Sequence, residues 1–247
     1  MLQILTWNIK ACQTADQIAY LTAEARPDVL VLTEYRQLMR DDRLSAALHQ
    51  AGWIYQHTPV TQPKVRGVLI ASRIPLDILP PDTTFDFGAL AGELSPRVAR
   101  ISLPAHDLTL IGVYMPFADG PAKEALWAAL NAYARAHSSE RYVITGDLNS
   151  SVEGESEGQY VYTPGPLKAI REVAIDAWAE MAERYRLPKR ERYTWYSKTK
   201  YGLYGIRLDY AFLSPALREQ LVRAHHDHTV RLAGLSDHSA LFIGLAL

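Results

Sequence analysis

The sequence predicts an α/β protein in which two β-sheets pack face to face and helices cover their outer faces. Apolar runs typical of strands outnumber the helical patterns, and several of these runs follow one another directly as pairs. This order favours sheet-on-sheet packing with outer helices over a simple alternation of strand and helix. With 247 residues, 48% of them hydrophobic, the chain is long enough to bury one large core. We therefore expect a single domain over residues 1–247.

Apolar runs predict six strands in the first half of the chain, over residues 2–7, 28–33, 53–57, 67–72, 98–103 and 108–114. The run at 28–33 is apolar throughout, which favours a central strand covered on both faces. Two helical patterns separate the early strands. One covers residues 15–25 and stops before Pro27, and the other covers residues 38–51 and closes at Gly52.

The second half of the chain is expected to contain two long helices and three further strands. The Ala-rich segment 122–137 follows Pro121, a residue that favours the first turn of a helix. A buried strand follows at 142–145, and then an acidic loop rich in Gly and Tyr, which we expect to be mobile. That loop covers residues 151–166, and the elements after it are a helix over 167–185, strands over 206–213 and 239–245, and a short helix near 216–223.

Polar side chains stand where five of these strands end and in the turn before the last strand, at Asn8, Glu34, Tyr114, Asp147 with Asn149, Asp209, and Ser236-Asp237-His238. Taken alone, the segment from Gly146 to Asn149 is equally consistent with a turn, because Gly, Asp and Asn are common turn residues. One polar residue at a strand end is an ordinary cap. Their repetition after apolar runs predicts a single site at one edge of a sheet.

Seven motifs carry a family resemblance, in order between residues 4 and 245: Trp7-Asn8, Glu34 after a buried strand, Gly67-Val-Leu-Ile-Ala-Ser-Arg73, Gly112-Val-Tyr114-Met-Pro116, Gly146-Asp147-Leu-Asn149, Arg207-Leu-Asp209-Tyr210 and Ser236-Asp237-His238. Together they resemble the motif set of the endonuclease/exonuclease/phosphatase superfamily. The Tyr114-Met-Pro116 element is similar to the branch of exonuclease III and the abasic-site endonucleases. The resemblance implies a DNase I-like, four-layer α/β/β/α sandwich with a divalent metal ion at one end.

The resemblance also implies a metal site. Glu34 would bind Mg²⁺ or Mn²⁺, with Asn8 beside it, and Asp237 would complete the site directly or through water. Mg²⁺ requires hard oxygen ligands, which these side chains supply. The only cysteine in the sequence is Cys12, so clustered thiolates that would favour zinc are lacking. For Asp237, a role as a simple turn cap stays open as an alternative.

The same likeness assigns catalytic roles to the remaining strand-end residues. Asp147 would orient or deprotonate the attacking water, and Asn149 would hold that water or a phosphoryl oxygen. His238 would face the phosphate, while Asp209 fixes its tautomer and favours the imidazolium form. Tyr114 would donate a hydrogen bond to the phosphate, although an aromatic residue at a strand end also packs well in a core.

Residues 187–207 form the most basic stretch of the chain, with six lysines and arginines against one glutamate and several aromatic residues between them. Cations beside stacking surfaces favour binding of a single-stranded or frayed nucleic acid, with Trp195 and Arg207 as substrate contacts. Arg97 in Pro-Arg-Val-Ala resembles an arginine near the phosphates in this branch. Three alternatives stay open here: Arg97 is a surface arginine, the aromatic side chains pack inward, or Arg207 forms an ion pair with Asp209.

These residues predict a divalent-metal-dependent phosphodiester hydrolase, most consistent with a nuclease acting on DNA. A phosphomonoesterase or a phospholipid or inositol-phosphate hydrolase would use the same residues, and a nucleic-acid-binding module without catalysis is a third alternative. Phe117, Lys10 and Ile206 stand where abasic-site enzymes often carry an amide, an acid and a tryptophan. These departures weaken an assignment to abasic-site repair in particular.

Composition narrows the class of protein further. A net charge of −1 excludes a globally basic DNA-coating protein, and a single cysteine permits no intramolecular disulfide, which fits a reducing compartment. No apolar run reaches the length of a membrane span, so we expect a cytoplasmic monomer that does not bind membranes. The run His225-His226-Asp227-His228 lacks a placed third ligand and favours surface histidines over a metal site.

Overall fold

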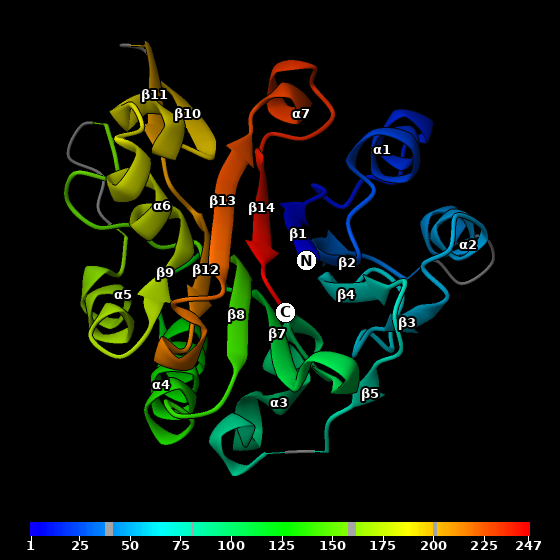
Figure 1. The fold of residues 1–247 in the computed structure, drawn as a ribbon, viewed down its shortest axis with the longest axis horizontal. Coiled ribbons are helices and arrows are strands. Elements are labelled where there is room, and N and C mark those ends of the chain that lie inside the picture. The colour runs from blue at the N-terminus through cyan, green and yellow to red at the C-terminus, as the bar shows by residue number, and fades with distance from the viewer. Residues whose placement is uncertain (38–41, 81, 158–161, 200–201) are drawn as a thin grey trace.

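The computed structural model describes residues 1–37, 42–80, 82–157, 162–199 and 202–247. Within these ranges the strands form two six-stranded sheets and one two-stranded hairpin (Figure 1). The first sheet has the order β13 (Leu221–Asp227), β14 (Ala240–Leu245), β1 (Leu2–Asn8), β2 (Val29–Tyr35), β4 (Gly67–Ser72) and β3 (Tyr55–His57). Its strands β1 and β2 are parallel, and the other neighbours are antiparallel.

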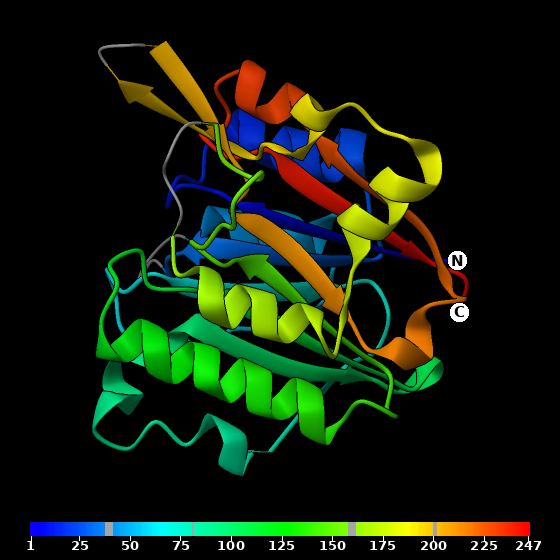
Figure 2. The same ribbon diagram turned by 90° about the vertical axis from the view of Figure 1, so that its left-hand side faces the viewer.

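The second sheet has the order β5 (Asp77–Ile78), β6 (Val98–Leu103), β7 (Leu108–Tyr114), β8 (Tyr142–Asp147), β12 (Asp209–Leu213) and β9 (Ile175–Asp176). Its parallel pair is β7 and β8. In each sheet, therefore, a helical crossover returns the chain so that two strands end at the same edge. The hairpin of β10 (Trp195–Thr199) and β11 (Gly202–Ile206) projects from the end of the molecule opposite the two termini (Figure 2).

Helices cover the outer faces of both sheets. Over the first sheet lie α1 (Ala15–Ala19), continued by a π-helical segment (Tyr20–Ala25), and α2 (Arg43–Gln50), and over the second lie α4 (Pro121–Ala136) and α5 (Pro164–Arg171). Helix α6 (Ala177–Tyr185) packs against β12 and β13 and so spans one side of the sandwich. Shorter helical segments are α3 (Ala91–Leu94), α7 (Thr229–Leu232) and the 3₁₀ turns Thr83–Phe85, Gly88–Leu90, Ser95–Arg97, Pro104–His106, Lys189–Arg192 and Pro215–Leu217. None of the helices in the described ranges is long and apolar enough to cross a membrane.

Three hydrophobic cores separate the four layers, because successive strand residues point to opposite faces of a sheet. In the first sheet, Ile4 and Val31 face the second sheet, while their neighbours Leu5 and Leu30 face the helices. The second sheet shows the same alternation, and Leu126 of α4 packs in the core between that helix and the sheet. The expected four-layer α/β/β/α sandwich is therefore confirmed.

Two helical predictions in the second half of the chain were wrong. The expected helix over residues 167–185 is two helices, since the chain leaves α5 after Arg171 and adds β9 to the edge of the second sheet. Asp176 ends that strand and caps α6, its side chain accepting a hydrogen bond from the Ala179 N–H at 3.2 Å. The expected short helix near 216–223 is a 3₁₀ turn followed by edge strand β13.

Three other expected elements have different bounds or surroundings in the structure. The expected strand over residues 206–213 is two strands, β11 and β12, separated by Arg207 and Leu208. The expected helix over 38–51 begins at Arg43 in the structure, and residues 38–41 lie outside the described ranges. The expected acidic loop at 151–166 is described except for residues 158–161, and its Glu155 is buried rather than facing solvent.

Candidate active site

The polar residues predicted at strand ends meet at one edge of the sandwich. In the second sheet the strand register places Tyr114 of β7 beside Asp147 of β8, and Asp147 beside Asp209 of β12. Three functional side chains thus come from directly neighbouring positions on three strands. The first sheet adds Asn8 at the end of β1 and His238 from the turn before β14.

Glu34 reaches this edge through an irregularity in β2. The pairing of β2 with β4 shifts between Thr33 and Tyr35, and Glu34 has a φ of 56°, an uncommon value for a residue other than glycine. The bulge turns the side chain toward the strand ends. Its Oε1 atom accepts hydrogen bonds from Asn8 Nδ2 at 3.2 Å and from the Tyr114 hydroxyl at 3.3 Å.

Asn8 connects the two sheets at the site. Besides Glu34 of the first sheet, its Nδ2 donates to Asp147 Oδ2 of the second sheet at 2.8 Å. Its Oδ1 atom accepts from the Lys10 N–H at 2.8 Å. Because three partners orient its amide, Asn8 fixes the position of the two carboxylates relative to each other.

Asp147 is held from several sides and is 2% exposed. The Asn149 N–H donates to Asp147 Oδ1 at 3.0 Å, and Asn149 Nδ2 donates to Oδ2 at 3.2 Å and to the Met115 carbonyl at 2.9 Å. Gly146, just before, has a φ of 153°, and a Cβ there would lie 1.8 Å from the Val113 carbonyl oxygen. Only glycine therefore permits the close approach of β8 to β7 that sets the position of Asp147.

His238 and Asp209 form a buried pair, with Nδ1 of the ring 2.8 Å from Asp209 Oδ2. Among the described residues, Asp147, Asp209 and His238 are the group whose ligand atoms all lie within 4.8 Å of one another. Asp209 Oδ1 is buried with no hydrogen-bond partner. An acceptor left unpaired in a buried acidic cluster points to a cation or a substrate group that is supplied from outside.

Burial and neighbouring charges shift the pKa values of Asp147 and His238. Burial raises the pKa of Asp147 above its usual range, and the Asp209 charge adds to this effect while the His238 charge opposes it. Burial alone would lower the pKa of His238, but the charges of Asp209 and Asp147 outweigh it and raise that pKa to about 9. The arrangement thus places a carboxylate of increased basicity beside an imidazolium.

Tyr114 remains a hydrogen-bond donor at neutral pH. Burial and the charges of Glu34 and Asp147 raise the pKa of its phenol to about 12. The predicted substrate residue Arg97 lies over its ring, with the guanidinium carbon 4.7 Å from the ring centroid. Arg97 is therefore placed next to the site, as expected, and partly accessible to a ligand.

The prediction that Arg207 contacts substrate was wrong, and so was its suggested pairing with Asp209. The Arg207 side chain is fully buried and bonds to Asp176 Oδ2 at 2.8 Å and to Glu155 Oε1 at 2.9 Å. Arg171 completes this cluster with bonds of 2.7–2.8 Å to the same two carboxylates. The expected acidic loop thus provides, through Glu155, an internal partner for Arg207.

Two other predicted residues lie at the rim of the site. Asp237 is partly exposed, stands outside the buried cluster, and has Lys10 Nζ at 3.7 Å from its Oδ2. Trp195 pairs through its backbone with His238, which attaches the base of the basic hairpin directly to the site. Of the aromatic residues in this stretch, Tyr193 is buried, so part of the aromatic surface does turn inward, while half-exposed Tyr196 packs beneath Arg231 at 4.2 Å.

Three residues of the site were not predicted from sequence. Arg66 Nη1 lies 2.7 Å from Glu34 Oε2. Lys123 Nζ, fully buried, donates to the Asn149 carbonyl at 2.7 Å, and its position on the apolar face of a helix was the available signal. The Thr194 hydroxyl accepts from the Asp209 N–H at 3.2 Å, and nothing local in the sequence indicates that contact.

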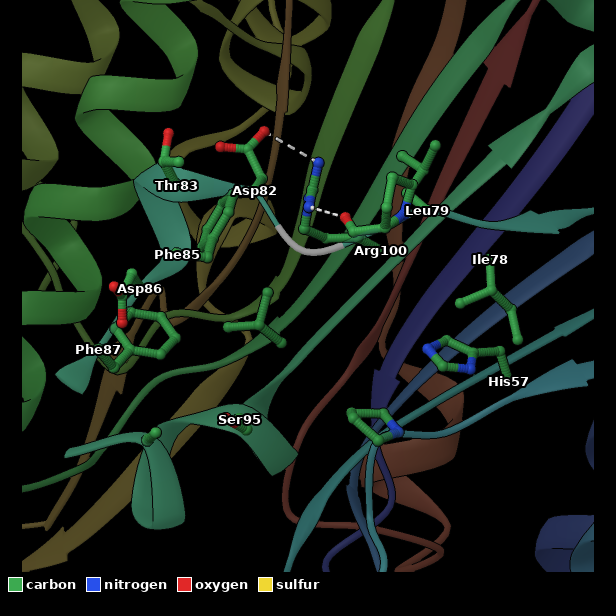
Figure 3. A pocket seen from close by; sticks show the side chains of 14 residues that line it. His57, Ile78, Leu79, Asp82, Thr83, Phe85, Asp86, Phe87, Ser95 and Arg100 are labelled. Atoms are coloured by element: carbon green, nitrogen blue, oxygen red, sulfur yellow. Dashed lines mark hydrogen bonds and ion pairs between the residues drawn. The ribbon is translucent and has the colours of Figure 1, made fainter. Parts of the chain in front are cut away.

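A cavity of about 520 Å³ lies elsewhere, near β5 and the segment 82–98 (Figure 3). Its lining includes Phe85, Phe87, Ile78 and His57, with Arg100 bonded to Asp82 at one side. None of the strand-end residues lines it. The buried polar cluster, and not this largely apolar cavity, is therefore the candidate active site.

A double sandwich with carboxylates, amides and a histidine at its strand ends defines the class of hydrolases that act on phosphoric esters. The chain belongs to the Endonuclease/Exonuclease/phosphatase family, whose sequence profile matches residues 5–238. The resemblance inferred from the motifs is thereby confirmed. A search of curated proteins finds no match.

Solved structures share the fold over the full length of the chain. A DNA-hairpin product complex of the 3' phosphatase NExo from Neisseria superposes with a TM-score of 0.79 at 23% identity, covering 100% of both chains. An AP endonuclease from Archaeoglobus fulgidus gives a TM-score of 0.78 at 22% identity, again over 100% of both chains. The endonuclease domain of the TRAS1 retrotransposon gives 0.67 at 15% identity, covering 100% of this chain and 99% of that one.

Proposed function

We propose that this chain is a divalent-metal-dependent phosphodiester hydrolase that cleaves DNA. The observation that carries the proposal is the buried cluster of Asp147, Asp209 and His238, with its unpaired Asp209 Oδ1, at an edge where both sheets meet. Glu34, Asp147 and Asp209 offer carboxylate oxygens, which are the hard ligands that fit Mg²⁺ or Mn²⁺. In this proposal Glu34 holds the ion and Asp237 assists through water. When bound, the ion stabilises negative charge on the phosphoryl oxygens.

Asp147 is the proposed base. Its buried carboxylate is oriented by Asn8 and Asn149, and its raised pKa makes it a stronger proton acceptor than an exposed aspartate. It therefore accepts the proton of the attacking water. Asn149 is fixed through its own carbonyl by the buried Lys123, so the oxygen nucleophile meets a rigid pair of side chains.

His238 and Tyr114 are the proposed hydrogen-bond donors to the phosphate. Asp209 accepts from His238 Nδ1, which leaves the Nε2–H of the imidazolium to donate to a phosphoryl oxygen. Tyr114 donates its phenolic proton, which it retains at neutral pH. Two donors aimed at an oxygen that gains charge stabilise the transition state more than the ground state.

DNA is the proposed substrate because cations line the approach to this edge. Lys198 is exposed on the hairpin that joins the site at Trp195, and Arg97 and Arg66 lie beside Tyr114 and Glu34. The Neisseria structure holds a DNA hairpin, and the Archaeoglobus structure is an AP endonuclease. A terminal phosphomonoester on DNA is the second candidate substrate, since that Neisseria protein is described as a 3' phosphatase.

The deciding assay uses the purified protein with Mg²⁺ or Mn²⁺ on plasmid DNA, single-stranded DNA, an abasic-site duplex, a 3'-phosphorylated duplex and RNA. We expect metal-dependent cleavage of at least one DNA substrate and loss of that cleavage in Asp147→Asn. Activity that persists in Asp147→Asn and in His238→Ala would contradict the mechanism. Release of inorganic phosphate alone, without chain cleavage, would replace the nuclease by the phosphatase.

A further inference from the structure

Glu34 forms an ion pair with a cation of the same chain, Arg66. Arg66 Nη1 lies 2.7 Å from Oε2, while Oε1 accepts from Asn8 and Tyr114. Both oxygens of the proposed metal-binding carboxylate are thus engaged by protein donors. The partners differ in burial, since the Arg66 side chain is 44% exposed and that of Glu34 is 15% exposed.

We propose that Arg66 is an internal counter-ion that pairs with Glu34 in the absence of a metal ion, would withdraw when an ion binds Glu34, and would then contact the phosphate of the substrate. The inference rests on the proposed function, because it takes Glu34 as the metal-holding carboxylate. A guanidinium cannot lose its proton at working pH. Close to a divalent cation it must therefore either move away or weaken the binding of that cation by repulsion.

The surroundings of Arg66 allow the side chain to move while its backbone stays in place. A Cβ on the next residue, Gly67, would lie 2.0 Å from the Pro96 carbonyl oxygen, so the start of β4 packs closely against the turn Ser95–Arg97. The exposed guanidinium, in contrast, borders solvent. Arg207 shows the opposite arrangement, with a fully buried guanidinium held by two carboxylates.

A second pair of the same kind supports the inference. Asp237, the other carboxylate proposed to assist the metal ion, has Lys10 Nζ at 3.7 Å from Oδ2. Glu34 and Asp237 therefore each face an exposed cation, whereas the buried Asp147 and Asp209 face His238. The rim charges are balanced within the chain before any ion arrives, and an ion entering there exchanges with a side chain.

The test measures Mn²⁺ affinity directly, by titration calorimetry and by the electron paramagnetic resonance signal of unbound Mn²⁺. Arg66→Ala is expected to bind Mn²⁺ about threefold to tenfold more tightly than the wild type, since a competing cation is removed. Arg66→Lys keeps the charge and should stay near the wild-type affinity. Lys64→Ala, which removes one charge from an exposed position in the same loop, is the matched control and should change the affinity less than twofold.

A second measurement separates the two roles of Arg66. At saturating Mn²⁺, Arg66→Ala should raise KM for DNA by about threefold to tenfold, so metal and substrate affinities change in opposite directions. If Arg66→Ala binds Mn²⁺ no more tightly than Lys64→Ala does, the inference is overturned. If Glu34→Gln retains wild-type Mn²⁺ affinity, the metal site of the proposed function itself is wrong. Lost binding in Glu34→Gln together with unchanged affinity in Arg66→Ala would overturn the inference alone.

Discussion

Two buried clusters of ionisable side chains lie on either side of Leu208, and their charges are balanced differently. Before it, Arg207 joins Arg171 to Asp176 and Glu155, so two cations face two carboxylates. After it, Asp209 and Asp147 share only His238, and Asp209 Oδ1 stays unpaired. The charges of the first cluster balance within the chain, although Arg207 Nε and Arg171 Nε also lack hydrogen-bond partners, whereas the second cluster has two carboxylates for one histidine.

The pKa values express the same difference. Burial alone would raise the pKa of both aspartates, but Arg207 and Arg171 lower that of Asp176 to about 2, while the pKa of Asp147 is raised. The nearby histidines differ as well. The pKa of His238 is raised, whereas burial and then the charge of Arg207 hold the pKa of His226 well below its usual range. A neighbouring charge thus decides whether a buried group acts in structure or is ready for proton transfer.

The largest effect is expected from Asp147→Asn in the second cluster. An amide of the same shape keeps the packing but cannot accept the proton of water, so kcat should fall on the order of 10³-fold. Thermal unfolding should show a melting temperature equal to or above that of the wild type, because a buried charge has been removed. A comparable loss of both activity and melting temperature would point to a structural role instead.

Arg207→Ala tests the first cluster. Removing the cation leaves Asp176 and Glu155 buried beside a single arginine, and we expect the free energy of unfolding to fall by about 3–5 kcal/mol. Urea denaturation followed by circular dichroism measures this change. At a temperature where the variant is folded, DNA cleavage should remain within about tenfold of the wild type, because the guanidinium makes no contact with substrate. A large loss of activity in a fully folded variant would indicate that Arg207 acts in the site after all.

Asp209→Asn sharpens the comparison inside the catalytic cluster. Asparagine can still accept a hydrogen bond from His238 but no longer favours the imidazolium, so kcat should fall on the order of 10²-fold. Single-turnover cleavage with excess protein measures the chemical step. Thr194→Val offers a milder perturbation, because the carboxylate stays and the lost hydrogen bonds are those from the Leu208 and Asp209 backbone N–H groups to the Thr194 hydroxyl. Equal losses in both variants would argue that position, and not charge, matters at Asp209.

The smallest expected effect is a pH dependence of stability caused by His226. Its ring stacks on Trp178 with the centroids 5.3 Å apart, and Nδ1 bonds to the Glu191 carbonyl at 2.8 Å. Because its pKa is lower in the folded state, the unfolded chain takes up more protons once the pH falls below about 6.5. The wild type should lose up to about 2 kcal/mol between pH 7.5 and 5 from this group. His226→Gln should reduce that slope in urea titrations, and an unchanged slope would assign the pH dependence to other groups.

Much of the fold and of the site's composition was predictable because the signals are local. Each strand end carries its functional residue next to the apolar run that forms the strand, as at Asn8 and Asp209, and the structure brings these ends together. The four-layer arrangement followed from the motif resemblance and from the order of strands. The edge strand β13 was missed because Leu221 and Ala224 are buried around exposed Val222 and Arg223, a three-residue spacing that is also typical of a helix. Its His226 is buried, so the expectation of surface histidines was wrong at this position.

The pairing of charges could not be predicted, because it depends on contacts between distant segments. Arg207 meets Asp176, which is 31 residues away, and Glu155, which is 52 residues away. A basic residue in a basic segment gave no sign that it would be buried. Arg66 is similar, since 32 residues separate it from Glu34 and only the bulge at Glu34 brings the two side chains together.

The hydrogen bonds of Asn8 have a mechanical consequence. One amide nitrogen donates to Glu34 on one sheet and to Asp147 on the other, so the lengths of these two hydrogen bonds depend on how the sheets are aligned. Sliding one sheet against the other by a fraction of an ångström would lengthen one of these bonds and turn the base away from its water. Substitutions that repack the core between the sheets, for example at Val31 or Leu110, should therefore change the rate of hydrolysis without touching any residue of the site.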